Sequence, residues 1–200
     1  VDELSIANFN SSNIFSILIN RWPMGISSGD EVVGTYAIAE DYHQATESNL
    51  QVSCANNVLN GIKIAVPDAG LASHMVVVAT SSQGAELRLV NLKDPSITVS
   101  PQKNIDTSKA FFKVVFNNTP SQLLGQSGQG WEYIQHLLDQ AAVLFAFEQV
   151  GGSQAALDMA KAYSLERFAF GRQIGSYQAI KHKLADMYIA TELARSNAYY

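Results

Sequence analysis

The stretch "RFAFGRQIGSYQAIKHKLADM", residues 167–187, interrupts a chain segment that otherwise reads as helix. Gly171 and Gly175 break the helical pattern and predict a connection between two long helices, one from about residue 130 and one over about 176–200. Arg167 and Arg172 flank this connection, where a guanidinium can hold a phosphate or a carboxylate with two hydrogen bonds. Phe170 could stack on a flat ring. The competing interpretation places the arginines in solvent and Phe170 in the core.

The preceding part of the chain has a different spacing of apolar residues, one typical of strands. Residues from about 32 to 119 contain short runs rich in valine, isoleucine and aromatics, such as "HMVVVAT" and "KAFFKVVF", separated by Asn, Gly, Pro or Ser. Asn60-Gly61 predicts a tight turn between two strands. This pattern predicts a small antiparallel barrel or sandwich. "GQSGQG", residues 125–130, is the expected hinge before the helices.

Composition excludes several classes of protein. A formal net charge of −5 argues against nucleic-acid binding. Cys54 is the only cysteine, so no internal disulfide can form; we interpret it as a packed small side chain in a reducing, cytoplasmic compartment. No run approaches the roughly 20 apolar residues of a membrane span, and the acidic start is unlike a signal peptide. The last helix pattern lacks a cap, and we expect the chain to be an internal piece of a longer protein.

Three further features are open to more than one interpretation. Glu40 and Asp41 end a strand pattern, where paired acids can be catalytic but more often cap or stay solvated. His182 has no other His or Cys at ligand spacing, so no metal site is expected and a surface position is favoured. Neither of the glycine-rich phosphate loops GxGxxG and GxxxxGK[ST] occurs.

The stretch from residue 162 to 200 resembles the first helices of the C-terminal domain of acyl-CoA dehydrogenases. The family pattern Y-x-x-x-R-x-x-F-G-x-x-I-x-x-x-Q-x-x-x-x-x-L-A-D-M is matched at Tyr163, Arg167, Phe170, Gly171, Ile174, Gln178, Leu184, Ala185, Asp186 and Met187. Upstream, "SSGDEVVGTYAIAED", "VLNGIKIAVPDAGLAS" and "LLGQSGQGW" resemble other family motifs in the same order. The resemblance extends from about residue 21 to 200.

The resemblance implies a division into three parts. Residues 1–22 would be the tail of an N-terminal helical domain, 23–124 a middle antiparallel β-barrel domain, and 125–200 the first helices of an antiparallel helical bundle. The expected fold class is therefore α+β. The implied activity is FAD-dependent dehydrogenation of an acyl-CoA thioester, as in the β-oxidation of fatty acids or steroid side chains. Its implied partners are an acyl-CoA, electron-transfer flavoprotein or a similar acceptor, and further subunits of a homo- or hetero-oligomer, dimer or tetramer, with no nucleic acid and no membrane span.

The resemblance also assigns cofactor-binding positions. The first group is Arg167, Phe170, Gly171 and Gln178, whose counterparts in the family hold the pyrophosphate and adenine of a neighbouring subunit's FAD. The flavin-ring group is Tyr36, Ile38 and Ala39. Here the chain departs from the family: Ala39 and Pro67 stand where threonines are usual, and Ala65 where a tryptophan is usual.

No catalytic residue is expected in this chain. The usual catalytic glutamate of the family lies beyond the position of Tyr200, and the Glu-Arg pair that replaces it in some members aligns with Ala141-Ala142. Glu148 is interpreted as structural or interfacial. The losses around the flavin ring leave an alternative open, a non-catalytic or half-site subunit that clamps the FAD of a related chain. An acyl-CoA oxidase is a third interpretation.

Overall fold

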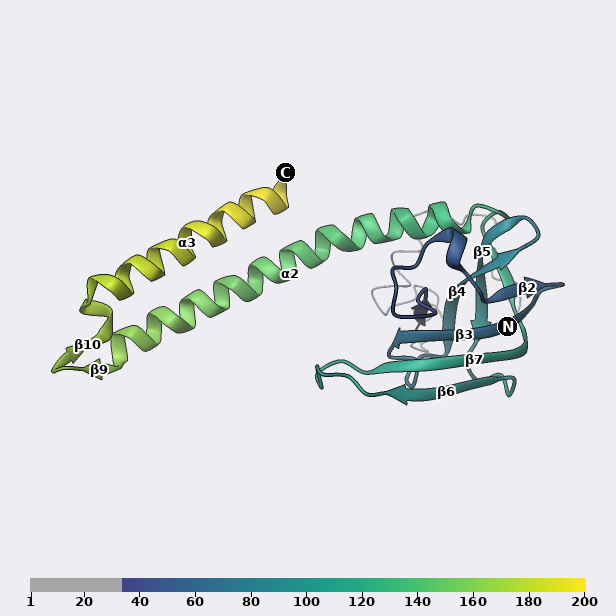
Figure 1. Ribbon diagram of the computed structural model, residues 1–200, viewed down its shortest axis with the longest axis horizontal. Coiled ribbons are helices and arrows are strands. Elements are labelled where there is room, and N and C mark those ends of the chain that lie inside the picture. Colours follow the sequence, from purple (N-terminus) through teal and green to yellow (C-terminus); the bar gives the residue numbers. More distant parts are fainter. Residues whose placement is uncertain (1–33) are drawn as a thin grey trace, which may run out of the picture. The chain divides into compact units, whose positions relative to one another are not determined.

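A computed structural model describes residues 34–200, which divide into two compact units (Figure 1). The first ends at Leu137, and the second runs from Leu138 to Tyr200. The helical tail expected over residues 1–22, and the start of the expected domain 23–124, lie outside the described residues.

The first unit is built on an eight-stranded sheet with the order β6-β7-β3-β2-β4-β5-β8, with β1 paired beside it to β4. The strands are β1 (Gly34–Ala37), β2 (Ser53–Ala55), β3 (Val58–Pro67), β4 (His74–Ser81), β5 (Gly84–Asn91), β6 (Ile97–Gln102), β7 (Phe111–Pro120) and β8 (Gln122–Leu124). A short 3₁₀ helix, η3 (Glu47–Asn49), lies in the loop between β1 and β2.

The prediction of an antiparallel β-barrel is wrong. Strand β1 pairs with β4 in parallel over four residues, and β2 also meets β4 in parallel, through Ser53 and Thr80. In the described part of the chain the sheet ends at β6 on one side and β8 on the other, so it is mixed and open. The class stays α+β. Apolar alternation along a strand reports which face is buried, but neither the direction of its neighbour nor whether distant edges join.

Strand β4 explains how the sheet buries both faces. Met75, Val77 and Ala79 belong to one apolar cluster, whereas Val76 and Val78 belong to the other. Successive side chains of a strand point to opposite faces, so the run "MVVVA" reads as continuous apolar sequence because both faces are covered. The second cluster includes Ile134 and Leu137 from the start of helix α2 (Gly130–Glu166).

The tight turn predicted at Asn60-Gly61 is also wrong. Both residues lie inside β3, and the β2–β3 turn is instead made by Asn56 and Asn57, with φ of 52° and 63°. Gly61 marks an irregularity in the β3–β7 register, and a Cβ there would lie 2.9 Å from Val52 Cγ2. The glycine is therefore needed for a bulge and a close approach rather than for a turn.

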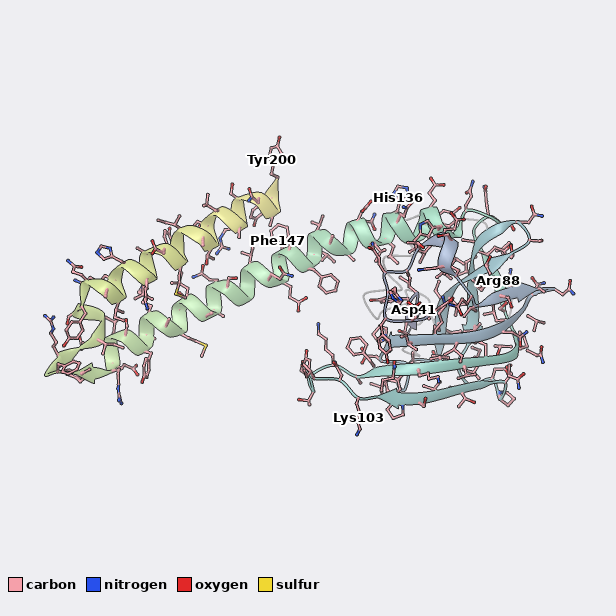
Figure 2. All side chains as sticks on the ribbon, viewed as in Figure 1. Asp41, Arg88, Lys103, His136, Phe147 and Tyr200 are labelled. Carbon is pink, nitrogen blue, oxygen red and sulfur yellow. The ribbon has the colours of Figure 1, made fainter. Side chains whose placement is uncertain are left out.

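The second unit contains most of α2 and the helix α3 (Gln178–Tyr199), as the predicted helix periodicity required. Between them lie a two-stranded hairpin, β9 (Phe168–Ala169) and β10 (Arg172–Gln173), and the 3₁₀ helix η4 (Ile174–Ser176). Phe147 of α2 lies near the end of α3 (Figure 2), and its ring meets that of Tyr199 edge-on, with centroids 4.9 Å apart. Arg195 Nη2 donates to Gln154 Oε1 at 2.8 Å, so the last turns of α3 contact the middle of α2.

Candidate functional site

The first group of predicted site residues lies at the end of β1, next to β3. The backbone N–H of Ile64 donates to the carbonyl of Ala39 at 2.9 Å, so the chain after β1 continues alongside β3. This places Ile38 and Ala39 next to the segment that holds Ala65. Tyr36 is half-buried, and burial raises the pKa of its hydroxyl. The structure thus brings the predicted flavin-ring positions to one strand end, which we call the strand-end site (residues 36–40 and 63–67).

An ion pair that the sequence did not reveal fixes this strand end. Lys63 Nζ donates to Glu40 Oε1 at 2.7 Å and to the carbonyl of Ile38 at 2.8 Å, and the Lys63 side chain is fully buried. The Glu40 carboxylate also accepts from the backbone N–H groups of Gln51 and Val52. Burial lowers the pKa of Lys63 to about 8, partly offset by the hydrogen bond and the charge of Glu40. Glu40 is therefore a structural acid, not a free base.

Asp41, the second acid of the pair, stays at the surface. Its carboxylate accepts from the backbone N–H of His43 at 2.8 Å, and this hydrogen bond lowers the pKa of Asp41. The two acids thus separate: one anchors the strand end and the other stabilises a local turn. The interpretation that they cap or stay solvated is the correct one for Asp41, whereas Glu40 is buried against Lys63.

Backbone donors are scarce at the strand-end site. The N–H of Ala65, a residue with a φ of 51°, donates to Gln102 Oε1 at 2.7 Å. Pro67 has no N–H, and its carbonyl accepts from the hydroxyl of Thr35. Ala39 has no side-chain hydroxyl. Groups that would hydrogen-bond the edge of a flat polar ring are thus either missing or already paired within the chain.

The second group of predicted residues lies on the β9–β10 hairpin of the other unit. Phe170 and Gly171 form its two-residue loop, with φ of 53° and 80°. A loop with both central residues at positive φ is a type I′ turn, which suits the twist of a hairpin and favours glycine. A bulky residue at positive φ is uncommon, and such strain persists where the surroundings impose it. The turn leaves the Phe170 side chain 98% exposed, which excludes the core interpretation within the described unit.

Arg167 and Gln178 lie at the same helix–hairpin–helix connection. Arg167 follows α2 directly, donating its backbone N–H to Tyr163 at 2.9 Å, and Gln178 is the first residue of α3. Both side chains are exposed. Tyr177 Oη donates to the carbonyl of Ala169 at 2.9 Å and ties the hairpin to the start of α3. The four predicted residues Arg167, Phe170, Gly171 and Gln178 are therefore exposed residues of one helix–hairpin–helix connection, which we call the hairpin site.

The other candidate residues from the sequence lie outside the strand-end and hairpin sites. Cys54 is buried in the sheet core, and His182 lies exposed on α3. Ala141 and Ala142 lie on α2, and neither position carries a carboxylate. Over residues 34–200, no three His, Cys, Asp or Glu side chains come together in a way that could hold a metal ion. Over the same range, no helix has the length and apolar character needed to cross a membrane.

A buried polar network on β5 was also missed. Arg88, labelled in Figure 2, lies in the sheet unit. It is 2% exposed, and its guanidinium donates to Glu86, Asn57 and Ser121. Glu86 accepts from the hydroxyls of Ser81 and Ser127 as well. The network borders a cavity of about 380 Å³. The signal available in the sequence was the pair of charges at alternate positions of "AELRLV", which must share one face of a strand whose neighbours are all apolar.

Known proteins resemble this chain in sequence and structure. The family model described as "Acyl-CoA dehydrogenase, C-terminal domain" matches residues 128–200. The mitochondrial short-chain specific acyl-CoA dehydrogenase of Bos taurus is 30% identical over 190 residues, covering 88% of this chain and 46% of the relative. Acyl-CoA dehydrogenase IpdE2 of Mycolicibacterium smegmatis is 38% identical over 101 residues, covering 50% of this chain and 30% of the relative.

Solved structures agree with these relatives. The butyryl-CoA dehydrogenase of Megasphaera elsdenii superposes with a TM-score of 0.78 at 25% identity, covering 84% of this chain and 48% of that one. An acyl-CoA dehydrogenase of Geobacillus kaustophilus has the same TM-score and coverage at 20% identity, which shows the shared fold alone. The chain spans about half the length of the first two structures and of the bovine relative. With the family model, the relatives and the retained motif in agreement, the chain belongs to the acyl-CoA dehydrogenase family.

Proposed function

We propose that the protein to which this chain belongs carries out FAD-dependent α,β-dehydrogenation of an acyl-CoA thioester. The observation that carries the proposal is the hairpin site, where a turn at positive φ exposes Phe170 in the same connection that holds Arg167 and Gln178. The names of the relatives support the reaction class, since they are acyl-CoA dehydrogenases. The division into a middle β domain over 23–124 and C-terminal helices from 125 onward remains part of this proposal.

The hairpin site has the chemistry to hold the adenosine diphosphate end of FAD. The Arg167 guanidinium offers paired donors to a phosphate, and the exposed Phe170 ring offers a flat apolar surface to a base. Gln178 adds an amide donor and acceptor at the start of α3. Gly171 serves through the backbone, because its φ of 80° lets the hairpin turn tightly enough to present Phe170. Bound there, FAD would supply the hydride acceptor for the dehydrogenation.

The strand-end site fits a flavin ring less well. Tyr36 and Ile38 keep a partly apolar surface, but Ala39 and Pro67 contribute no side-chain or backbone donor in place of the expected threonines. The N–H of Ala65 is held by Gln102. This contrast favours a second candidate function, a half-site or non-catalytic subunit whose hairpin site clamps the FAD of a related chain. The catalytic base is proposed to lie outside residues 1–200 in either case.

The remaining assignments follow the family and are proposals. The substrate is an acyl-CoA, the electron acceptor is electron-transfer flavoprotein or a similar protein, and the assembly is a homo- or hetero-oligomer. A role in the oxidation of fatty acids or of steroid side chains fits these assignments, and the cytoplasmic location inferred from cysteine usage stays a prediction.

The experiment is to purify the intact protein and record its visible spectrum, then its acyl-CoA-dependent reduction of an artificial electron acceptor. Flavin absorbance with substrate-dependent reduction is the expected result. A colourless protein that cannot be reconstituted with FAD would overturn the proposal for a homomeric enzyme. Co-expression with related chains, followed by a count of flavins per chain, separates the two candidates: one flavin per chain in a homo-oligomer contradicts the half-site function.

A further inference from the structure

The β9–β10 ladder orders the side chains around Arg172. Arg172 is paired with Ala169, and Gln173 with Phe168, so Arg172 and Ala169 share one face of the hairpin. The ladder continues one step further, because the backbone N–H of Ile174 donates to the carbonyl of Arg167 at 2.8 Å. Strand alternation then places Arg167 on the same face as Arg172. Diagonal neighbours of this kind lie about 7–8 Å apart, within reach of two long side chains.

Tyr177 holds Arg172 in place on that face. The guanidinium carbon of Arg172 lies 4.0 Å from the centroid of the Tyr177 ring, a cation–π stacking contact. The ring is itself fixed, since Tyr177 Oη donates to the Ala169 carbonyl at 2.9 Å and its backbone precedes α3. A guanidinium held by stacking keeps its in-plane N–H donors available, and its conformational freedom is already reduced before any ligand binds.

The two arginines form no ion pair with the described residues around them. Within residues 34–200, neither Arg167 nor Arg172 forms a salt bridge with a carboxylate, and both side chains are exposed. Ala169, their neighbour on the same face, carries no charge. Two cations on one face repel each other, and a ligand with two adjacent negative groups relieves that repulsion.

We propose that Arg172, positioned by Tyr177, is a second anion contact of the hairpin site, so that Arg167 and Arg172 together bind a diphosphate. The assignment rests on the proposed function for Arg167 and extends it to a residue outside the family pattern given above. FAD and coenzyme A both contain a diphosphate. The shared chemistry is the phosphate anhydride, and the source is an outcome of the test.

The test uses the intact protein stripped of flavin and measures affinities for FAD, ADP, coenzyme A and riboflavin, which has no phosphate. Arg172→Gln is expected to weaken diphosphate binding about 10- to 100-fold and to leave riboflavin binding unchanged. Lys181→Gln, the matched control, removes an exposed cation from the first turn of α3 and is expected to leave every affinity unchanged. Arg172→Lys keeps the charge without the planar donors and is expected to fall between wild type and Arg172→Gln.

Tyr177 separates positioning from a general loss of structure. Tyr177→Leu removes the stacking contact and is expected to lower diphosphate affinity about as far as Arg172→Gln, while the double variant is no weaker than either single variant. Tyr177→Phe keeps the stacking ring but loses the hydrogen bond to Ala169, and its diphosphate affinity is expected to fall between those of wild type and Tyr177→Leu. If the losses from Tyr177→Leu and Arg172→Gln instead add, Tyr177 acts on the fold and not through Arg172.

The outcomes distinguish this inference from the proposed function. If Arg172→Gln lowers the affinity for FAD, the result supports both the two-arginine site and the proposed FAD-dependent function. If it lowers only the affinity for coenzyme A, the result supports a two-arginine site that binds the diphosphate of coenzyme A. Wild-type protein that binds ADP or coenzyme A but never FAD overturns the proposed function and leaves the two-arginine site standing. If Arg172→Gln and Lys181→Gln have the same affinities for FAD, ADP, coenzyme A and riboflavin, the two-arginine site is wrong, even where FAD binds normally.

Discussion

Lys63 Nζ lies 2.7 Å from Glu40 Oε1, and this ion pair joins the segment after β1 to the middle of β3, with the Lys63 side chain fully buried and the Glu40 side chain 7% exposed. The same ammonium donates to the Ile38 carbonyl, and the same carboxylate accepts from the backbone after the loop 41–50. One buried pair therefore fixes three chain segments. Because buried charges lose their hydration, such a pair is stabilising only while both partners and their hydrogen bonds are present.

Removing one partner is expected to cost more than removing both. Lys63→Met leaves the Glu40 carboxylate buried with only backbone donors, and the free energy of unfolding is expected to fall by about 3–5 kcal/mol. The double variant Lys63→Met/Glu40→Gln leaves no buried charge and is expected to lose less than Lys63→Met alone. Urea unfolding of the intact protein, with hydrogen exchange of the β1 and β3 peptides, measures both. A double variant as unstable as the sum of the single ones would contradict a coupled pair.

The depressed pKa of Lys63 predicts a dependence of stability on pH. The folded pKa of about 8 lies below the ordinary value of 10.5, so between these values the unfolded chain binds more protons than the folded one. The contribution of Lys63 to stability is therefore full above about pH 10.5 and is lost as pH falls through about 8. The stability difference between wild type and Lys63→Met should widen from about pH 7 to about pH 10. A constant or narrowing difference would show that the pKa of Lys63 is not lowered.

The fold was predictable where it depends on local periodicity. The runs containing β4, β5 and β7, and both long helices, follow from the apolar spacing of their own residues. Strand direction and sheet closure did not follow, because the parallel pairing of Gly34 with His74 joins residues far apart in the chain. The turn predicted at Asn60-Gly61 was wrong for a related reason. Gly61 is needed because its backbone packs closely against Val52, and this contact exists only in the folded sheet.

A motif predicted that Arg167, Phe170 and Gln178 lie at one connection between two helices, and the structure places them there. Their role in binding FAD stays a prediction. The Lys63–Glu40 pair was invisible, because 23 residues separate the partners and each also suits a solvated surface position. The stacking of Arg172 on Tyr177 depends on a hairpin register that the sequence does not specify on its own.

Two glycines on α2 are expected to respond oppositely to alanine. A Cβ on Gly130 would lie 2.5 Å from the Glu86 backbone of β5, so Gly130→Ala must move backbone and is expected to destabilise the first unit. A Cβ on Gly151, in the helix interior, meets no atom within 4 Å, so Gly151→Ala is expected to stabilise the helix by about 1 kcal/mol. Thermal unfolding of the intact protein compares the two. A loss of stability in Gly151→Ala would mean that this helix face is covered in the intact protein.

The hairpin turn allows strain to be separated from ligand binding. Phe170→Gly removes a bulky side chain from a φ of 53° and is expected to leave the fold as stable or more stable, because the exposed ring buries little surface. The same variant is expected to weaken FAD retention. Gly171→Val places a β-branched residue at a φ of 80°, where a Cβ meets no neighbour, so any loss of stability reports backbone strain alone. FAD retention unchanged in Phe170→Gly would remove this ring from the cofactor site.

Arg167→Ala tests the central contact of the hairpin site. Loss of an arginine–phosphate pair is expected to cost on the order of 2–4 kcal/mol, or roughly 30- to 1000-fold in FAD affinity. The Arg167 side chain is exposed, and the hydrogen bonds of Arg167 with Tyr163 and Ile174 are made by its backbone. The unfolding temperature of Arg167→Ala is therefore expected to stay close to that of wild type. Lys183→Ala, which removes an exposed cation from α3, is the matched control and should retain FAD.

Flavin content per chain after dialysis, measured on the intact oligomer, is the readout. Equal flavin content in Arg167→Ala and Lys183→Ala would place the diphosphate away from Arg167, whereas loss in Arg167→Ala alone, at unchanged unfolding temperature, assigns it to this side chain.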